Sequence, residues 1–264
     1  MRDRARKIRR DVVEMVYQSK DGHPSPSMSS ADIVAALYFG VMNVHPEDPR
    51  WADRDRFILS KGHACPILYA ALARRGYFSP DILPSLRMID SKLQGHPDMN
   101  KTPGIDATAG SLGNGLSIGL GIASAAKYQG RSYRTFVLTG DGELQEGIVW
   151  EALMASSKLN PGRLVLIVDN NGMQSGGKVT DVSGLEPIVP KLKAFGWNVI
   201  EIDGHRMEEI VGALETAAVA PTPTAIVAKT VKGQGVSFMI GDNTWHKRVF
   251  TDAEYAQAVK ELGD

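Results

Sequence analysis

The sequence predicts an α/β domain, a parallel sheet with helices on both faces, and two observations support this prediction. Short apolar, β-branched segments alternate along the chain with longer segments whose apolar residues recur at helical spacing. No linker rich in proline, glycine or serine and no shift in composition divides the 264 residues. We therefore expect residues 1–264 to form a single domain.

The first helix is expected close to the N-terminus, where Ile8, Val12, Met15 and Val16 lie on one helical face. The basic segment RDRARKIRR is interpreted as the solvated side of this helix rather than as a targeting peptide or a nucleic-acid-binding arm. Cations at a helix N-terminus oppose the helix dipole, so acidic partners are expected beside them.

A second helix is expected to extend to Phe39, with Ser29 or Ser30 as its cap and Asp32 placed for a capping box. The next expected elements are a strand at RFILS, a helix over residues 66–75 and a helix that begins at Ser79-Pro80. A glycine-dense stretch, GSLGNGLSIGLG at residues 110–121, then leads into another helix.

This glycine-dense stretch does not match a dinucleotide-binding motif. No apolar strand precedes it, and the spacing of Gly113, Gly115 and Gly119 is one residue too long. We interpret it as a loop whose backbone approaches a flat ligand, followed by a helix that packs closely through Gly119 and Gly121. Glycines that serve helix packing alone are the alternative interpretation.

A strand–helix–strand unit follows. The segment RTFVLT is predicted to be a buried parallel strand that ends in a tight turn at Gly140 and Gly142. Helical spacing of apolar residues predicts a helix over residues 147–159, and the apolar run LVLIVD predicts the second strand.

Both strands of such a unit end at the same edge of the sheet, so Asp141 and Asn171 are expected to converge. A carboxylate, an amide oxygen and a nearby backbone carbonyl suit a hard cation such as magnesium, whose octahedron water and diphosphate oxygens would complete. Free N–H groups at the helix start after Gly142 suit the same anion. A simple turn with an Asx turn is the alternative for either end alone.

Two more strands and two helices complete the pattern. They are strands at WNVIEID and TAIVAK, a helix between them over residues 207–218, and a C-terminal helix that begins at Thr251-Asp252. The chain has no internal repeat and no low-complexity tract.

Composition excludes several classes of function. Thirty basic residues balance thirty acidic ones, which argues against general nucleic-acid binding. No apolar run approaches the ~20 residues that span a membrane, and no signal-peptide pattern opens the chain. The single cysteine, Cys65, forms no internal disulfide and suits a reducing cytosol, so a cytoplasmic protein is expected.

Several motifs together resemble the transketolase family. The segment Gly-Asp-Gly-x-Leu-Gln-Glu-Gly at residues 140–147, followed by Asn170-Asn171, is similar to the thiamine diphosphate motif in its transketolase form. Further elements occur in the family order: Gly22-His23-Pro24, Ser60-Lys61-Gly62-His63, Gly95-His96-Pro97, Gly110-Ser111-Leu112-Gly113-Asn114-Gly115 and Lys229-Thr230-Val231-Lys232-Gly233-Gln234-Gly235. The resemblance covers nearly the whole chain and implies the diphosphate-binding fold of this family.

The resemblance implies thiamine diphosphate and magnesium as cofactors, with calcium or manganese as substitutes for the magnesium. The implied metal ligands are Asp141, Asn171 and Met173. The implied cofactor-binding residues are His63, Gly110, Ser111, Leu112, Gly140, Asp141, Gly142, Glu143, Asn171 and His246. Among them, main-chain groups at Gly110 and Leu112 would hold the aminopyrimidine, and His63 and His246 would reach the diphosphate.

The resemblance also implies catalytic roles. His23 and His96 correspond to histidines that hydrogen-bond the sugar hydroxyls and assist proton movement, and His246 also lies near the substrate. Glu146 matches a residue of the network that links the two cofactor sites of the dimer. An ordinary acid in the first turn of a helix is the alternative for Glu146.

The domains that follow in an ordinary transketolase are absent from the sequence. The pyrimidine-binding domain, with the glutamate that activates the cofactor, is therefore expected on a partner chain, together with the third domain. We expect the N-terminal subunit of a split transketolase, inactive alone, with two copies of each chain and sugar substrates. Its expected reaction moves a two-carbon ketol unit from a ketose, phosphorylated in the simplest case, to an aldose.

The chain departs from the family pattern near the expected substrate channel. Ser25-Pro26 replaces small residues and is expected to stiffen a loop. Lys247-Arg248 follows His246 where glycine is usual, and these two cations would bind an acidic substrate or pair with the partner subunit. Ser175 takes the place of an apolar residue. Two other functions stay open: a subunit of a 2-oxo acid or deoxyxylulose phosphate type enzyme, and a non-catalytic assembly protein that keeps the fold.

Overall fold

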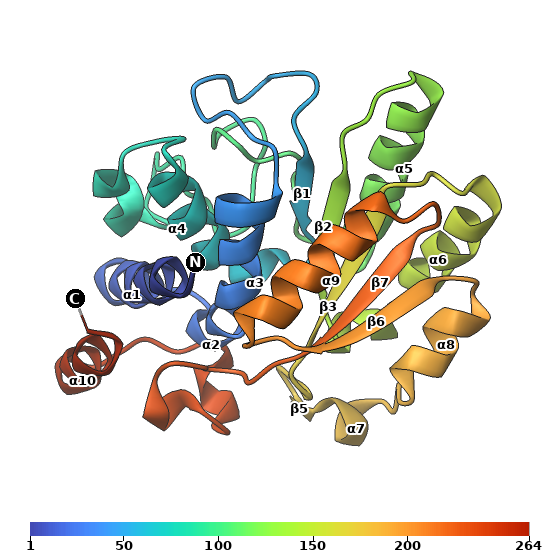
Figure 1. The fold of residues 1–264 in the computed structure, drawn as a ribbon. Coiled ribbons are helices and arrows are strands. Elements are labelled where there is room, and N and C mark those ends of the chain that lie inside the picture. The colour runs from blue at the N-terminus through green and yellow to red at the C-terminus, as the bar shows by residue number, and fades with distance from the viewer. Residues whose placement is uncertain (264) are drawn as a thin grey trace.

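The computed structural model describes residues 1–263, and its centre is a five-stranded sheet with the order β1-β2-β3-β7-β6 (Figure 1). The strands are β1 Arg56–Leu59, β2 Thr135–Gly140, β3 Leu164–Asn170, β6 Asn198–Asp203 and β7 Thr224–Lys229. All neighbouring strands are parallel, which confirms the predicted sheet. A small antiparallel pair, β4 Met173–Gln174 and β5 Gly177–Lys178, lies outside it.

Helices cover both faces of this sheet, as predicted (Figure 1). One face packs against α1 Arg2–Ser19, α2 Pro24–Met28, α3 Ala31–Ala36, α4 Cys65–Arg75, α9 Met207–Val219 and α10 Asp252–Leu262. The other face packs against α5 Asn114–Tyr128, α6 Gly147–Leu159 and α8 Ile188–Ala194. The short α7, Val179–Val182, follows β5. Within residues 1–263, no helix combines the length and the hydropathy needed to cross a membrane.

Strand side chains divide between the two faces by alternation. In β2, Phe136 and Leu138 join the core beneath α1 and α4, whereas Val137 joins the core beneath α5 and α6. All three are completely buried. Burial on both faces explains why this strand is continuously apolar in the sequence.

The register of the sheet brings several loops together at one edge. Gly140 at the end of β2 pairs with Asp169 of β3, and Asn170 pairs with Lys229 at the end of β7. The loops that follow β1, β2, β3 and β7 therefore begin side by side, at the carboxyl edge where ligands bind in open α/β sheets. The polar motifs of the sequence lie in these loops.

Helices α1 and α10, from opposite ends of the chain, lie side by side, and the rings of Tyr17 and Tyr255 stack with centroids 3.9 Å apart (Figure 1). The apolar face predicted for the first helix is fully buried. The expected acidic partner is found within the same chain, because Arg2 forms an ion pair with Glu208 at 2.6 Å.

The capping box predicted for the second helix is wrong. Helix α3 begins after Ser30, but the Ser30 side chain caps no backbone N–H, and the helix continues as a turn of π-helix over Leu37–Val41. The Asp32 carboxylate instead pairs with the buried Arg9 guanidinium at 2.5 Å. A buried arginine binds a carboxylate more strongly than a backbone N–H does, which removes Asp32 from the cap.

Two smaller predictions are also corrected. A Cβ at Gly119 would lie 2.4 Å from Val137, which confirms close packing there, but Gly121 is exposed with nothing within 4 Å. The segment with Ser25-Pro26 is buried helix α2 rather than a loop. Proline is accommodated at the start of this helix because the first turn needs no N–H donor.

Candidate functional site

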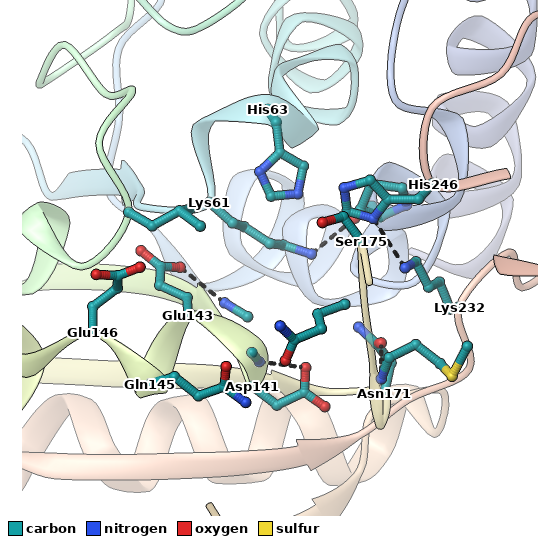
Figure 2. A pocket seen from close by; sticks show the side chains of 16 residues that line it. Lys61, His63, Asp141, Glu143, Gln145, Glu146, Asn171, Ser175, Lys232 and His246 are labelled. Atoms are coloured by element: carbon teal, nitrogen blue, oxygen red, sulfur yellow. Dashed lines mark hydrogen bonds between the residues drawn. The ribbon is translucent and has the colours of Figure 1, made fainter. Parts of the chain in front are cut away.

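The loops at the carboxyl edge enclose a cavity of about 200 Å³ (Figure 2). Ten of the implied cofactor-binding, metal-binding and catalytic residues line it: His63, Leu112, Gly140, Asp141, Gly142, Glu143, Glu146, Asn171, Met173 and His246. Figure 2 shows the imidazoles of His63 and His246 on one side and the side chains of Asp141 and Asn171 across from them. Segments far apart in the sequence thus meet at one site.

Asp141 carries a buried negative charge at this site. Its carboxylate accepts hydrogen bonds from the N–H groups of Gly142, at 2.8 Å, and Gly172, at 2.5 Å. Burial, followed by the nearby Asp169 carboxylate, raises the pKa of Asp141 to about 6. The side chain is 2 % exposed and forms no ion pair with any residue among 1–263. A buried acid of this kind is a good ligand for a cation supplied from outside the chain.

Asn171 is oriented by its neighbours. Its side-chain nitrogen donates to the Asp169 carboxylate at 3.2 Å, and its side-chain oxygen accepts from the N–H of Met173 at 3.1 Å. Residues 1–263 contain no cluster of three or more histidine, cysteine or acidic side chains suited to a metal. A cation here would therefore have one carboxylate, one amide oxygen and backbone carbonyls, a set that fits magnesium completed by diphosphate oxygens and water.

Three imidazoles lie against one another, and two of them, those of His63 and His246, line the opposite side of the cavity. The ring centroids of His23, His63 and His246 are 5.2 to 5.6 Å apart. Burial, followed by neighbouring positive charge, lowers the pKa of His23 to about 4, of His63 to about 2 and of His246 to about 3. All three rings are therefore neutral near pH 7 and can donate or accept hydrogen bonds.

We expect acidification to destabilise the chain through these imidazoles. Their pKa values lie below 6.5 in the folded chain, so the unfolded chain takes up protons first. The stability they contribute is present above pH 6.5 and is lost as the pH falls from 6.5 toward the folded values. Urea unfolding at pH 7 and pH 5 should show a smaller loss of stability in His63→Gln than in the wild type.

His45→Gln is the matched control, because His45 is an exposed histidine away from the cavity. This variant should keep the wild-type loss of stability. Asp141, whose pKa is raised, shifts stability in the opposite direction, so the comparison is between variants rather than between absolute values. If His63→Gln and the wild type lose equal stability between pH 7 and pH 5, the lowered pKa of His63 is contradicted.

Glu143 lies in the cavity wall, but its carboxylate is used within the chain. It accepts hydrogen bonds from the hydroxyl of Ser60 at 2.5 Å, the N–H of Gly113 at 2.8 Å and the N–H of Gly140 at 3.0 Å. Glu143 thereby joins the loop after β1, the end of β2 and the glycine-dense loop. Gly115 permits the same contact, because a Cβ there would lie 2.3 Å from the Ser60 hydroxyl.

The other predicted residues lie at the margin of the cavity. Gly110 and Ser111 are exposed, and a Cβ on Gly110 would meet nothing within 4 Å. His96 lies close to Gly62, beside the imidazole group, and burial lowers its pKa. Glu146, which lines the cavity, is exposed at the start of α6.

Sequence reasoning gave no role to a buried ion pair beneath the cavity. The Nζ of Lys61 lies 2.5 Å from the Asp169 carboxylate, and both side chains are at most 3 % exposed. Asp169 also accepts hydrogen bonds from the hydroxyls of Ser29, at 2.6 Å, and Thr230. The sequence did offer two signals for this pair. Asp169 lies at the carboxyl end of an apolar strand, and Lys61 directly follows a short predicted strand.

Sequence reasoning also gave no role to Lys232. Its Nζ lies in the cavity wall, 3.0 Å from Nδ1 of His246 and 2.9 Å from the side-chain oxygen of Asn243 (Figure 2). Burial, followed by the charge of Lys61, lowers the pKa of Lys232 to about 8. Two buried lysines and the neutral imidazoles of His63 and His246 make this wall suited to a phosphate or diphosphate.

Comparison with known proteins identifies the family. Residues 2–264 match the model of the transketolase, thiamine diphosphate binding domain. A subunit of the apulose-4-phosphate transketolase from Phocaeicola vulgatus is 40% identical over 259 residues, which cover 98% of this chain and 92% of that protein. The 6-deoxy-6-sulfo-D-fructose transketolase subunit SqwG from Clostridium sp. is 40% identical over 263 residues, covering 99% of this chain and 96% of that protein.

Solved structures agree with this result. Transketolase from Leishmania mexicana superposes with a TM-score of 0.94 at 33% identity, over 99% of this chain. The chain spans 41% of the length of that transketolase. The chain therefore belongs to the transketolase family: it is a transferase subunit, and residues 2–264 match the family's thiamine diphosphate-binding domain.

Proposed function

We propose that this chain is the cofactor-binding subunit of a two-chain transketolase that transfers a two-carbon ketol unit from a ketose to an aldose. The observation that carries the proposal is the convergence of Asp141, Asn171, His63 and His246 around one cavity. The similar subunits from Phocaeicola vulgatus and Clostridium sp. support it, because both are named as transketolase subunits and match this chain in length.

Magnesium is proposed to bind the Asp141 carboxylate, the Asn171 side-chain oxygen and the Met173 carbonyl. The buried charge of Asp141, which forms no ion pair with any residue among 1–263, supports this set. His63, His246, Gly142 and neighbouring main-chain groups are proposed to hold the diphosphate. Thiamine diphosphate, when bound, supplies the carbon nucleophile that cleaves the ketose and carries the two-carbon unit.

The remaining roles belong to residues around the cavity. Main-chain groups of residues 110–112 are proposed to receive the aminopyrimidine, and the accessible backbone at Gly110 supports this. Neutral His23 and His96 are proposed to orient the sugar hydroxyls and to move their protons. Because both rings are neutral near pH 7, each can accept a proton from a sugar hydroxyl directly.

The partner is proposed to be a chain with a pyrimidine-binding domain, and the assembly to contain two copies of each chain. Residues 1–264 then form one domain of the complete enzyme. The exposed Glu146 beside the cavity is proposed to contact the partner and to link the two cofactor sites.

Affinity purification of this chain from its native cell tests the proposal. A protein of roughly 300 residues should co-purify in equal amount, since one pyrimidine-binding domain and one further domain need about this length. The mixture should catalyse ketol transfer that depends on thiamine diphosphate and magnesium, whereas this chain alone should not.

Two results would contradict the proposal. Recovery of the chain alone under gentle conditions would favour the non-catalytic assembly protein. Turnover of 2-oxo acid donors but of no ketose would favour another class of thiamine diphosphate enzyme.

A further inference from the structure

Three charged side chains beside the cavity form a group that we call the rim cluster: Asp21, Arg87 and Lys247. The Arg87 Nε lies 3.1 Å from one Asp21 oxygen, and the Lys247 Nζ lies 3.9 Å from the other. Two cations therefore share one carboxylate, and the cluster has a net charge of +1. Burial, followed by the charges of Arg87 and Lys247, lowers the pKa of His23, and the Asp21 charge acts in the opposite direction.

Arg87 has unused hydrogen-bonding capacity in this cluster. Its guanidinium lies against Gly95, where a Cβ would be 2.9 Å from Cζ, so glycine permits this approach. Its Nη1 is buried and has no hydrogen-bond partner among residues 1–263. An unpaired charged donor is costly, and an acceptor from outside the chain would remove that cost. Gly95 directly precedes His96, so Arg87 packs against the segment that carries one of the proposed sugar-binding histidines.

Lys247 and Arg248 are adjacent cations with different environments. The Arg248 guanidinium pairs with Glu254 at 2.6 Å and lies over the ring of Trp245, 4.3 Å from its centroid. The Lys247 side chain is 57% exposed, and its only ion-pair contact among residues 1–263 is the long one with Asp21. Of the two, Lys247 is free to turn toward a ligand, and it directly follows His246 of the cavity wall.

We propose that Arg87 and Lys247 bind the acidic group of the sugar substrate, a phosphate monoester or a sulfonate, and that Asp21 competes with this group for both cations. The guanidinium fork and the ammonium group together match the several acceptor oxygens of such an anion. This inference rests on the proposed function, because it concerns the substrate of that same site. It makes the chain itself a determinant of substrate specificity.

The test uses the complete two-chain enzyme loaded with thiamine diphosphate and magnesium. The readout is the KM for fructose divided by the KM for fructose 6-phosphate, with 6-deoxy-6-sulfo-fructose as the sulfonate arm. Lys247→Gln should lower this ratio about fivefold, the effect of losing one partly exposed charge contact. If Lys247→Gln raises the KM for the sulfonate as much as the KM for the phosphate, the cluster binds both anions. A larger rise for one of them identifies the preferred anion.

Two further variants are included: one is expected to change the ratio in the opposite direction, and the other is a control. Asp21→Asn should raise the ratio, because it releases both cations while its amide oxygen still accepts the N–H of Gly22, now at 2.8 Å. Arg248→Gln should leave the ratio unchanged, since Arg248 is paired with Glu254. Equal ratios in Lys247→Gln and Arg248→Gln, or a lowered ratio in Asp21→Asn, would overturn the proposal.

Binding of inorganic phosphate separates this inference from the proposed function. In the cofactor-loaded enzyme the diphosphate site is filled, so thermal stabilisation by phosphate relative to chloride reports on other anion sites. This stabilisation should fall in Lys247→Gln and rise in Asp21→Asn. The same pattern without turnover of any ketose would refute ketol transfer and keep the anion site, whereas turnover without the pattern would refute the anion site alone.

Discussion

Replacement of Asp141 by asparagine is expected to abolish magnesium-dependent binding of thiamine diphosphate and to leave the chain folded. Asparagine keeps an oxygen for the N–H of Gly142 or Gly172, which now bond the two carboxylate oxygens. It removes the negative charge that the cation requires. Titration of the cofactor with and without magnesium should show an affinity reduced by about 100-fold or more.

The stability of the ligand-free variant gives an independent check. The Asp141 charge is buried near Asp169 and has no ion-pair partner among residues 1–263, so its removal should not lower the melting temperature of the ligand-free chain. Stabilisation by magnesium and cofactor together should disappear. If Asp141 binds a cation, its replacement should therefore leave the melting temperature of the ligand-free chain unlowered and should remove the stabilisation by magnesium and cofactor.

Glu151→Gln is a suitable control, because Glu151 is an exposed acid on helix α6 and its loss changes the net charge equally. It should bind cofactor like the wild type. Wild-type, magnesium-dependent affinity in Asp141→Asn would remove Asp141 from the metal site.

The sequence could predict the convergence of Asp141 and Asn171 because this convergence follows from local rules. The two apolar runs form β2 and β3, the helix between them is α6, and parallel strands end at a common edge. The predicted helix over residues 147–159 coincides with α6. Each step depends on a short segment of sequence, and each is confirmed.

The features that the sequence did not predict depend on contacts between distant segments. Lys61 and Asp169 are 108 residues apart, and nothing in either segment specifies the other. Asp32 looked like part of a helix cap because the partner that removes it, Arg9, lies in another helix. Local patterns indicate which groups reach the edge of the sheet, whereas tertiary packing decides which of them pair there.

Replacement of Lys61 by methionine is expected to be the most destabilising single change in the site. Methionine fills a similar volume but leaves the Asp169 carboxylate, which is 0 % exposed, without its cation. Removal of one partner from a buried ion pair costs about 3–5 kcal/mol. Urea unfolding at pH 7 should show this loss in the free energy of unfolding.

Lys232→Met is the matched control, because Lys232 is also a buried lysine of the same cavity. It is hydrogen-bonded to Asn243 and His246 and has no carboxylate partner among residues 1–263. Burial, followed by the charge of Lys61, already lowers the pKa of Lys232 to about 8, so its ammonium group is itself destabilised by its surroundings. This variant should lose little stability.

The double variant Lys61→Met with Asp169→Asn decides between loss of charge pairing and loss of packing. If the uncompensated carboxylate causes the instability, the amide should restore part of the stability that Lys61→Met loses, since it removes the charge and keeps an acceptor for the hydroxyls of Ser29 and Thr230. If shape alone matters, the double variant should be no more stable than Lys61→Met. The first outcome would show that the charge pairing of Lys61 and Asp169 stabilises the loops around the cavity. Lys61 also donates a hydrogen bond to the carbonyl of Pro26 at 2.8 Å, so the same side chain connects a further segment to these loops.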